Sequence, residues 1–295
     1  MCAASSRSRT QPIKSLDVTS SVKVKVEGGA KVRFELDGSR TVLKDLYQHD
    51  PVRILFPDNP PGELTIGVLT TTSGGLVGGD KIEVEVISGP GTQSMIMAQA
   101  AEKIYRSLGP DCLIDISVQA DNESWFEWLP QETILHQGAR MRRHTKLNLS
   151  GTARVMAGEF LVFGRHAMGE KMTEGLVRDS WDVSVGGRRV WADVFHLDGE
   201  LAKKIDHPAG LGGATGLASL VYAAPDAEDF LTLARELLAD QPEVRSAATF
   251  VNDVLLVRWL GADVFSLRKV YAKFWKKFRN QAGQQPEKLP RLWDI

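Results

Sequence analysis

Alternation between apolar and polar residues is the dominant pattern from about residue 20 to residue 200. Clear examples are VKVKV at 22–26, KVRFEL at 31–36, KIEVEVI at 81–87 and LIDISVQ at 113–119. A period of two is typical of strands with one buried face, and clusters of Gly, Pro, Asn or Asp separate these runs. The pattern predicts many short strands in a β-sandwich, a barrel or a stacked-sheet fold.

The C-terminal part of the chain changes to a helical period. Residues 226–240 carry an apolar stripe at helical spacing, with acidic residues in the first turn where the helix dipole favours them. Residues 263–280 carry a longer aromatic stripe, and DVLLVRWLG at 253–261 predicts a strand between the two helices. GLGGATGLA at 210–218 predicts a flexible loop. The expected fold class is therefore mostly β with two α-helices in the C-terminal region.

The 295 residues suffice for a large core, and neither an internal repeat nor a low-complexity tract divides them. We expect a flexible tail over 1–18 and a single domain over 19–295. The leader MCAASSRSRTQPIK is basic but lacks an apolar segment after it, so a frayed tail is favoured over a short organellar presequence.

Composition narrows the class of protein. The chain has 36 basic and 37 acidic residues, which gives no electrostatic reason to bind nucleic acid. Its only cysteines, Cys2 and Cys112, cannot form a disulfide framework or a zinc knuckle, and a reducing cytoplasm fits best. No apolar stretch approaches the length of a membrane span. We expect a cytoplasmic protein that binds neither nucleic acid nor a membrane.

The glycine-rich stretch GGLVGGD at 74–80 raises the question of a phosphate-binding loop. A Walker loop needs Lys and Ser or Thr directly after the last glycine and then a helix, whereas here Asp80 follows and a strand begins. The residues alone favour a glycine hairpin between the strands ELTIGVL and KIEVEVI, with Asp80 capping the turn.

Two acidic residues fall on predicted buried faces. Glu159 lies in RVMAGEFLVFG at 154–164, and Asp193 shares a face with aromatic residues in RVWADVFHL at 189–197. An unpaired buried carboxylate costs several kcal/mol or has its pKa raised, so each needs an arginine, water or a metal. The structural alternative is an ion pair, for example with one of three arginines: Arg154, Arg165 or Arg178.

Motifs for tight metal binding or catalysis are missing. The histidines show no HxH, HxxxH or HExxH spacing, although a weak carboxylate site would leave no such signature. No GxSxG motif occurs, and nothing marks Ser73 or Cys112 as an activated nucleophile. Glu127 and Glu132 could serve as an acid and a base, which keeps a carboxylate-dependent hydrolase on a β-rich fold open as the alternative function.

A run of basic residues lies in the last predicted helix. It consists of Arg268, Lys269, Lys273, Lys276, Lys277 and Arg279. Such a run is usually a solvated helix face, and the alternative is a docking surface for an acidic partner.

Taken in chain order, several segments resemble the urease accessory protein family UreD, also called UreH. The landmarks are GGLVGGD at 74–80, AAEKIYRS at 100–107, EWLPQETILHQGA at 127–139, GRHAMGE at 164–170 and LPRLWDI at 289–295. The resemblance extends from about residue 50 to the C-terminus, and more loosely from about residue 20.

This resemblance implies an elongated, mostly β architecture of stacked sheets, similar to a β-helix, and a non-enzymatic role in nickel-urease maturation. Family members bind UreF, which recruits the GTPase UreG, and the assembly docks on the urease apoprotein. Nickel is thought to pass through an internal tunnel of the UreD-like subunit. The resemblance thus implies a metallochaperone scaffold with Ni(II) in transit and no permanently bound cofactor.

The resemblance also gives the buried acids a role. Asp80, Glu159 and Asp193 match acidic tunnel positions of the family, and oxygen ligands without His or Cys would bind nickel weakly enough to release it. One departure is AQAAEKIYRS, where many relatives have a Pro-Gly-Ala-Ser or Pro-Gly-Ala-Thr run. Glu102 in this segment either adds a carboxylate near the path or pairs with Lys103 or Arg106.

Overall fold

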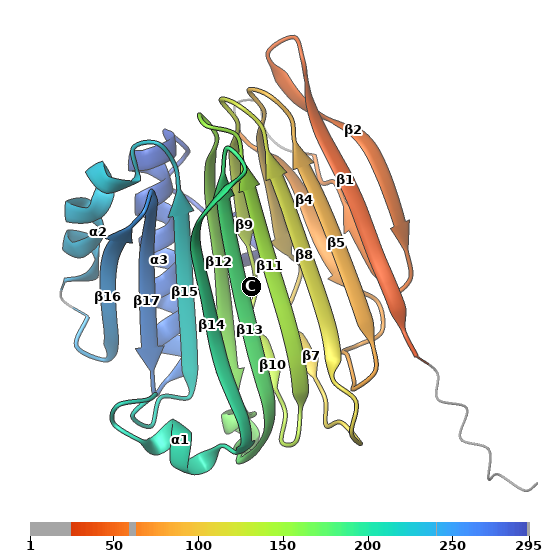
Figure 1. Cartoon of the computed structure of the whole chain (residues 1–295), viewed down its shortest axis with the longest axis vertical. Coiled ribbons are helices and arrows are strands. Elements are labelled where there is room, and N and C mark those ends of the chain that lie inside the picture. The colour runs from red at the N-terminus through yellow and green to blue at the C-terminus, as the bar shows by residue number, and fades with distance from the viewer. Residues whose placement is uncertain (1–24, 59–62, 240, 294–295) are drawn as a thin grey trace, which may run out of the picture.

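A computed structural model describes residues 25–58, 63–239 and 241–293. Its strands form two facing sheets, and helices cover one end of the second sheet (Figure 1). Sheet A has seven strands in the order β14-β13-β11-β8-β5-β1-β2. Their bounds are β1 Glu27–Asp37, β2 Arg40–His49, β5 Lys81–Ser88, β8 Cys112–Ala120, β11 Arg140–Leu149, β13 Glu174–Val185 and β14 Arg188–Glu200.

Sheet B has ten strands, eight of them in the order β16-β17-β15-β12-β9-β6-β4-β3. The short strands β7 and β10 extend it beside β12. The bounds are β3 Val52–Leu55, β4 Thr65–Thr71, β6 Gln93–Ala98, β7 Glu102–Ile104, β9 Trp125–Leu129, β10 Thr133–Leu135, β12 Arg154–Phe163, β15 Gly216–Ala223, β16 Val244–Val251 and β17 Val254–Gly261.

The chain winds between the two sheets. It passes from β5 in sheet A to β6 in sheet B, back to β8, then to β9, β11, β12 and β13. As a result β5, β8, β11 and β13 pair in parallel within sheet A, while β4, β6, β9 and β12 do so within sheet B. This stacked, β-solenoid-like arrangement confirms the predicted mostly β fold class and decides against a closed barrel.

The predicted glycine hairpin at 74–80 is wrong in its pairing. The strand before it, β4, pairs with β3 and β6 in sheet B, whereas the strand after it, β5, pairs with β1 and β8 in sheet A. The glycines therefore carry the chain from one sheet to the other. Gly75 has φ 142°, and a Cβ there would lie 2.9 Å from the Lys103 carbonyl oxygen, so this crossing requires glycine.

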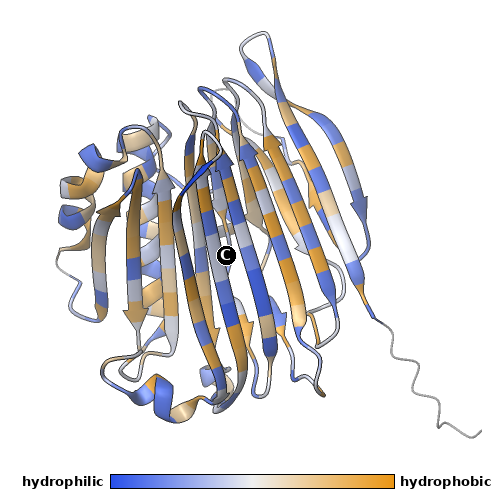
Figure 2. Cartoon of the chain, in the orientation of Figure 1, coloured by the Kyte–Doolittle hydropathy of each residue, from blue (hydrophilic) through white to orange (hydrophobic). Residues whose placement is uncertain are grey.

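Alternate side chains along the strands of both sheets point into one hydrophobic core between the sheets. In β11 the residues Met141, Thr145 and Leu147 are buried while Arg142 and Lys146 are exposed, and Figure 2 shows the same alternation along neighbouring strands. Buried side chains of both sheets meet in this core. A second core fills the space between the opposite face of sheet B and the C-terminal helices. Burial of each apolar face holds the three layers together.

The described residues contain three α-helices, one more than predicted: α1 Ala202–Asp206, α2 Leu231–Leu238 and α3 Val264–Gly283. The helix predicted at 263–280 is confirmed and starts after Asp263, whose carboxylate accepts a hydrogen bond from the Ser266 backbone at 2.7 Å. The helix predicted at 226–240 is shorter, because 227–230 form a 3-10 turn.

The remaining predicted elements can be compared with the observed ones in the same way. The strand predicted at 253–261 is β17, whereas the loop predicted at 210–218 ends where β15 begins at Gly216. The strand predicted at 22–26 lies mostly outside the described residues, and 25–26 precede β1 without strand structure. The tail predicted at 1–18 lies outside them entirely. Within the part of the chain that is described, no helix is both long and apolar enough to pass through a membrane.

Candidate functional site between the two sheets

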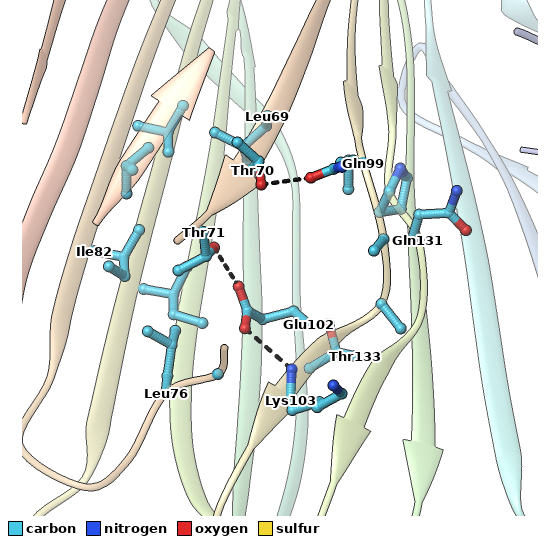
Figure 3. Close-up of a pocket in the computed structure, with 18 of the residues that line it drawn as sticks. Leu69, Thr70, Thr71, Leu76, Ile82, Gln99, Glu102, Lys103, Gln131 and Thr133 are labelled. Carbon is cyan, nitrogen blue, oxygen red and sulfur yellow. Dashed lines mark hydrogen bonds between the residues drawn. The ribbon is translucent and has the colours of Figure 1, made fainter. Parts of the chain in front are cut away.

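A cavity of about 230 Å³ lies between the sheets, close to the glycine crossing at 74–76. Sheet A contributes apolar side chains and Arg143 to its wall, and the sheet B side contributes most of the polar groups (Figure 3). Those polar residues are Thr70, Thr71, Gln99, Glu102, Lys103, Gln131 and Thr133. Oxygen-bearing side chains thus gather in an otherwise apolar interior.

Glu102 is the acidic residue in the wall of this cavity. Its carboxylate accepts a hydrogen bond from the Thr71 hydroxyl at 2.6 Å and one from the Lys103 backbone nitrogen at 3.0 Å (Figure 3). Burial raises the pKa of Glu102, and these two hydrogen bonds only partly oppose that rise. Of the two roles that the sequence left open, the geometry favours a carboxylate at the cavity over an ion pair with Lys103 or Arg106.

Arg143 connects the cavity to a buried carboxylate pair. Its Nη1 donates to the Thr133 hydroxyl at 3.1 Å, its Nη2 donates to Glu159 at 3.1 Å, and its Nε donates to Asp179 at 3.1 Å. The Trp181 indole nitrogen also donates to Glu159, at 3.1 Å. One arginine therefore serves two buried acids that come from different sheets.

Two carboxylates beside one guanidinium leave the cluster short of positive charge. Burial raises the pKa of Glu159 well above its ordinary value, and the neighbouring Asp179 raises it further, while Arg143 acts in the opposite direction. Removing water from a carboxylate disfavours its charged form, as does a second carboxylate nearby. Glu159 thus holds its proton to higher pH than a free glutamate does.

Strand register brings these groups into one row. In β10, Thr133 pairs in parallel with Glu102 of β7 on one side and with Leu161 of β12 on the other. Glu159 lies two residues before Leu161, so it shares the same face of β12. We call Glu102, Thr133, Arg143 and Glu159 the interior polar row.

Asp80, the first of the predicted nickel ligands, caps the glycine crossing. It is 2% exposed, and its carboxylate accepts hydrogen bonds from the backbone nitrogens of Val77 at 2.8 Å and Val26 at 3.1 Å. The suggestion from the sequence that Asp80 caps this turn is confirmed. The carboxylate also joins the turn to the start of sheet A.

Asp193, the last of the predicted ligands, lies on the inner face of β14 opposite Trp181 of β13. It forms an ion pair with Arg258 of β17, and both side chains are partly exposed. Because β17 belongs to sheet B, this pair closes the space between the sheets beyond the edge strand β14.

The three predicted acids do not converge on one metal centre. Within the described residues, no group of three or more His, Cys, Asp or Glu side chains is placed to hold a metal ion. Asp80, Glu159 and Asp193 instead have separate partners, namely backbone amides, Arg143 and Arg258. Their role in a nickel path stays a prediction.

The ion-pair alternative for the buried acids is correct in kind, but its suggested partners are wrong. Arg154 pairs with Asp226, and Arg165 pairs with Glu170. The partner of Glu159 is Arg143, which is not among the arginines predicted from the sequence. Its signal is present in RMRRHTKLNL, where alternation gives Arg143 the same buried face as Met141 and Thr145.

The carboxylates of the alternative hydrolase are both bound to arginines. Glu127 is fully buried and receives hydrogen bonds from Arg279 and from two indole nitrogens. Glu132 pairs with Arg268 at 2.6 Å. These contacts attach α3 to sheet B, so a structural role accounts for both residues.

Comparison with known proteins identifies the family of this fold. The family model described as "UreD urease accessory protein" matches residues 26–294. The chain belongs to the UreD family. The match spans both sheets, the cavity and α3, and so confirms the resemblance that the sequence landmarks carry.

Individual UreD relatives are similar over nearly their whole length. The chain is 45% identical over 274 residues to the urease accessory protein UreD of Magnetococcus marinus, covering 92% of this chain and 94% of the relative. It is 38% identical over 260 residues to UreD of a Methylobacterium species, with 87% and 90% covered. For UreD of Xanthobacter autotrophicus the identity is 37% over 267 residues, with 90% and 89% covered. The relatives are named accessory proteins, and their family serves urease.

Proposed function

We propose that this chain is a nickel metallochaperone scaffold, which conducts Ni(II) between sheets A and B to the urease active site. Membership of the UreD family supports a role in urease maturation. The observation that carries the finer proposal is the cavity between the sheets, whose oxygen-lined wall joins the interior polar row.

The chemistry of the row suits an ion in transit. Carboxylate, hydroxyl and amide oxygens are hard ligands, and they hold a first-row divalent ion more weakly than sets of imidazole or thiolate. Conduction needs sites that attract an ion but also release it. Glu102 and Glu159 take up protons more readily than free glutamates, so an arriving cation displaces a proton, and reprotonation favours its release.

The ends of the proposed path are Asp80 and Asp193. Asp80 lies at the glycine crossing, and Asp193 lies at the opposite side of the intersheet space with its carboxylate shared with Arg258. In this proposal a passing Ni(II) competes with the arginine for Asp193. No resident cofactor takes part.

The same proposal gives the chain three partners. It binds UreF, through UreF it reaches the GTPase UreG, and it docks on the urease apoprotein in the cytoplasm. The chain itself catalyses no reaction in this scheme. Its resemblance to family members and the accessory-protein names of its relatives support this assignment.

The test is urease activity after co-expression of the structural subunits and the other accessory proteins with nickel, with and without this chain. Glu102→Gln, Glu159→Gln and Asp193→Asn remove carboxylates from the proposed path while keeping the side-chain shapes. Glu200→Gln is the matched control, because Glu200 is 88% exposed.

Conduction predicts that activity depends on the chain and falls in the three path variants, provided that each stays folded and binds its partners. The control keeps full activity. Activity that depends on the chain but survives all three changes would leave a docking scaffold without a nickel path. Activity that never depends on the chain would refute the maturation role.

A further inference from the structure

The outer face of α3 carries positive charge without compensation from its own sequence. Residues 264–283 contain six basic side chains and no acidic one, whereas the whole chain has a net charge of −1. This concentration lies on the layer that covers sheet B on the side away from sheet A (Figure 1).

Two of the six basic residues point into the protein and are occupied. Arg279 is buried against Glu127, and Arg268 binds Glu132 and the Trp293 carbonyl oxygen, both at 2.6 Å. These two arginines hold the helix in place. The remaining four basic residues of the helix are all lysines.

The four lysines form one stripe. At 100° per residue, Lys269, Lys273, Lys276 and Lys277 fall within an arc of about 100°, opposite the buried aromatic residues. Within the described residues, neither Lys273 nor Lys277 forms an ion pair. We call these four residues the lysine stripe.

Phe265 extends the stripe at its N-terminal end. Its ring is 63% exposed, and the Lys269 ammonium lies 4.1 Å from the ring centre. Two acidic residues lie at this end of the helix, where Asp263 and Glu243 bind the backbone nitrogen and the hydroxyl of Ser266. From this end, the lysine stripe runs toward the C-terminal end of the helix.

We propose that the lysine stripe and Phe265 dock an acidic face of a partner protein in the urease maturation assembly, a proposal that rests on the function proposed above. Lys269 and Lys277 lie about 12 Å apart along the helix axis, with Lys273 between them. Carboxylates at about 6 Å intervals on the partner match this spacing, as successive turns of an acidic helix provide.

A protein fits this surface better than a polyphosphate or a membrane. Interfaces between proteins are enriched in aromatic residues and have a polar rim, and Phe265 with the lysines beside it offers both. The chain as a whole has 36 basic and 37 acidic residues, so its overall field does not attract nucleic acid. Opposite charges across the interface steer the partners together and set their orientation.

The experiment compares two triple charge reversals in the full chain. The first combines Lys269→Glu, Lys273→Glu and Lys277→Glu. The matched control combines Lys146→Glu, Lys171→Glu and Lys203→Glu, which changes the net charge equally at exposed lysines outside α3. Thermal unfolding checks that both variants remain folded.

Affinity is measured for each purified accessory protein and for apo-urease from the same organism, at low and high NaCl. We expect the stripe variant to lose at least about tenfold in affinity for one of these proteins, together with most of the salt dependence. The control variant keeps both. DNA and anionic lipid vesicles are the probes for the competing kinds of partner.

Equal affinity of the stripe variant and the wild type for every assembly protein would overturn this inference alone. An equal loss in the control would also overturn it, because net charge rather than this face would then govern binding. Wild-type binding to DNA or vesicles but to no assembly protein would contradict both the stripe proposal and the proposed function.

Discussion

Replacing Glu127 by methionine should strongly destabilise the attachment of α3 to sheet B. The Glu127 carboxylate is fully buried and accepts hydrogen bonds from Trp125 Nε1 at 2.9 Å, Trp275 Nε1 at 2.8 Å and Arg279 Nε at 2.9 Å. The second Arg279 contact, from Nη2, is also 2.9 Å. Removal of the Glu127 carboxylate leaves the buried Arg279 guanidinium and the two indole N–H groups without their shared acceptor.

The loss of stability expected for Glu127→Met depends on the hydrogen bonds that Arg279 retains. Its Nη1 still donates to the carbonyl oxygens of Pro286 and Lys288, at 3.0 and 2.8 Å, so the guanidinium retains part of its hydrogen bonding. Breaking a buried ion pair on one side typically costs 3–5 kcal/mol, so we expect the free energy of unfolding to fall by about 4 kcal/mol.

Urea unfolding of wild type, Glu127→Met, Arg279→Met and the double variant measures this cost and the coupling between the two residues. Because the double variant has no uncompensated charge, it should lose no more stability than Glu127→Met alone. A single-variant loss below about 1 kcal/mol, or strictly additive losses, would show that Glu127 and Arg279 do not form a buried ion pair that contributes to stability.

Three further predictions concern other buried groups. The pKa of Glu159 is raised above its ordinary 4.5, so the folded state holds a proton that the unfolded chain releases. The free energy of unfolding should therefore fall as pH rises above about 4.5, by up to about 1.4 kcal/mol per pH unit. Urea titrations at several pH values should show a smaller fall for Glu159→Gln than for the wild type. Burial raises the pKa of Cys112 to about 12, so an alkylating reagent at pH 8 should label it only as fast as the protein unfolds, and rapid labelling of folded protein would contradict this. Gly158→Ala places a methyl group against the Tyr271 hydroxyl and should lower stability by about 1–3 kcal/mol in thermal or urea unfolding; an unchanged midpoint would mean that α3 moves aside freely.

The strands and the last helix could be predicted from the sequence because their signals are local. Alternation in KIEVEVI and LIDISVQ reports one buried face, and the aromatic stripe of 263–280 reports a buried helix face. Which sheet a strand joins depends on strands far away in the sequence, so it has no local signal. The sequence predicts a hairpin for the strands flanking the glycine segment, because neither strand carries a local signal for its actual partners. Those partners are β6 for β4 and β8 for β5, and they come from later in the chain.

The candidate site could be predicted in part. Glu159 and Asp193 stand out as acids on apolar faces, and the inner faces of β12 and β14 bear this out. Their arginine partners depend on which strands of the two sheets lie opposite each other, which a single sequence does not give. Arg143 was detectable from alternation in its own strand, whereas the cavity beside Glu102 arises only from the packing of sheets A and B.

The most direct test of nickel conduction between the sheets is to fill the cavity and measure the nickel content of urease. Ala98 lines the cavity at the end of β6, so Ala98→Phe places a ring in the space of about 230 Å³. Ala247→Phe on the exposed face of β16 is the control. With both variants folded and bound to their partners, we expect only Ala98→Phe to lower the amount of nickel per urease active site. Equal nickel loading by Ala98→Phe, Ala247→Phe and the wild type would contradict the proposed path.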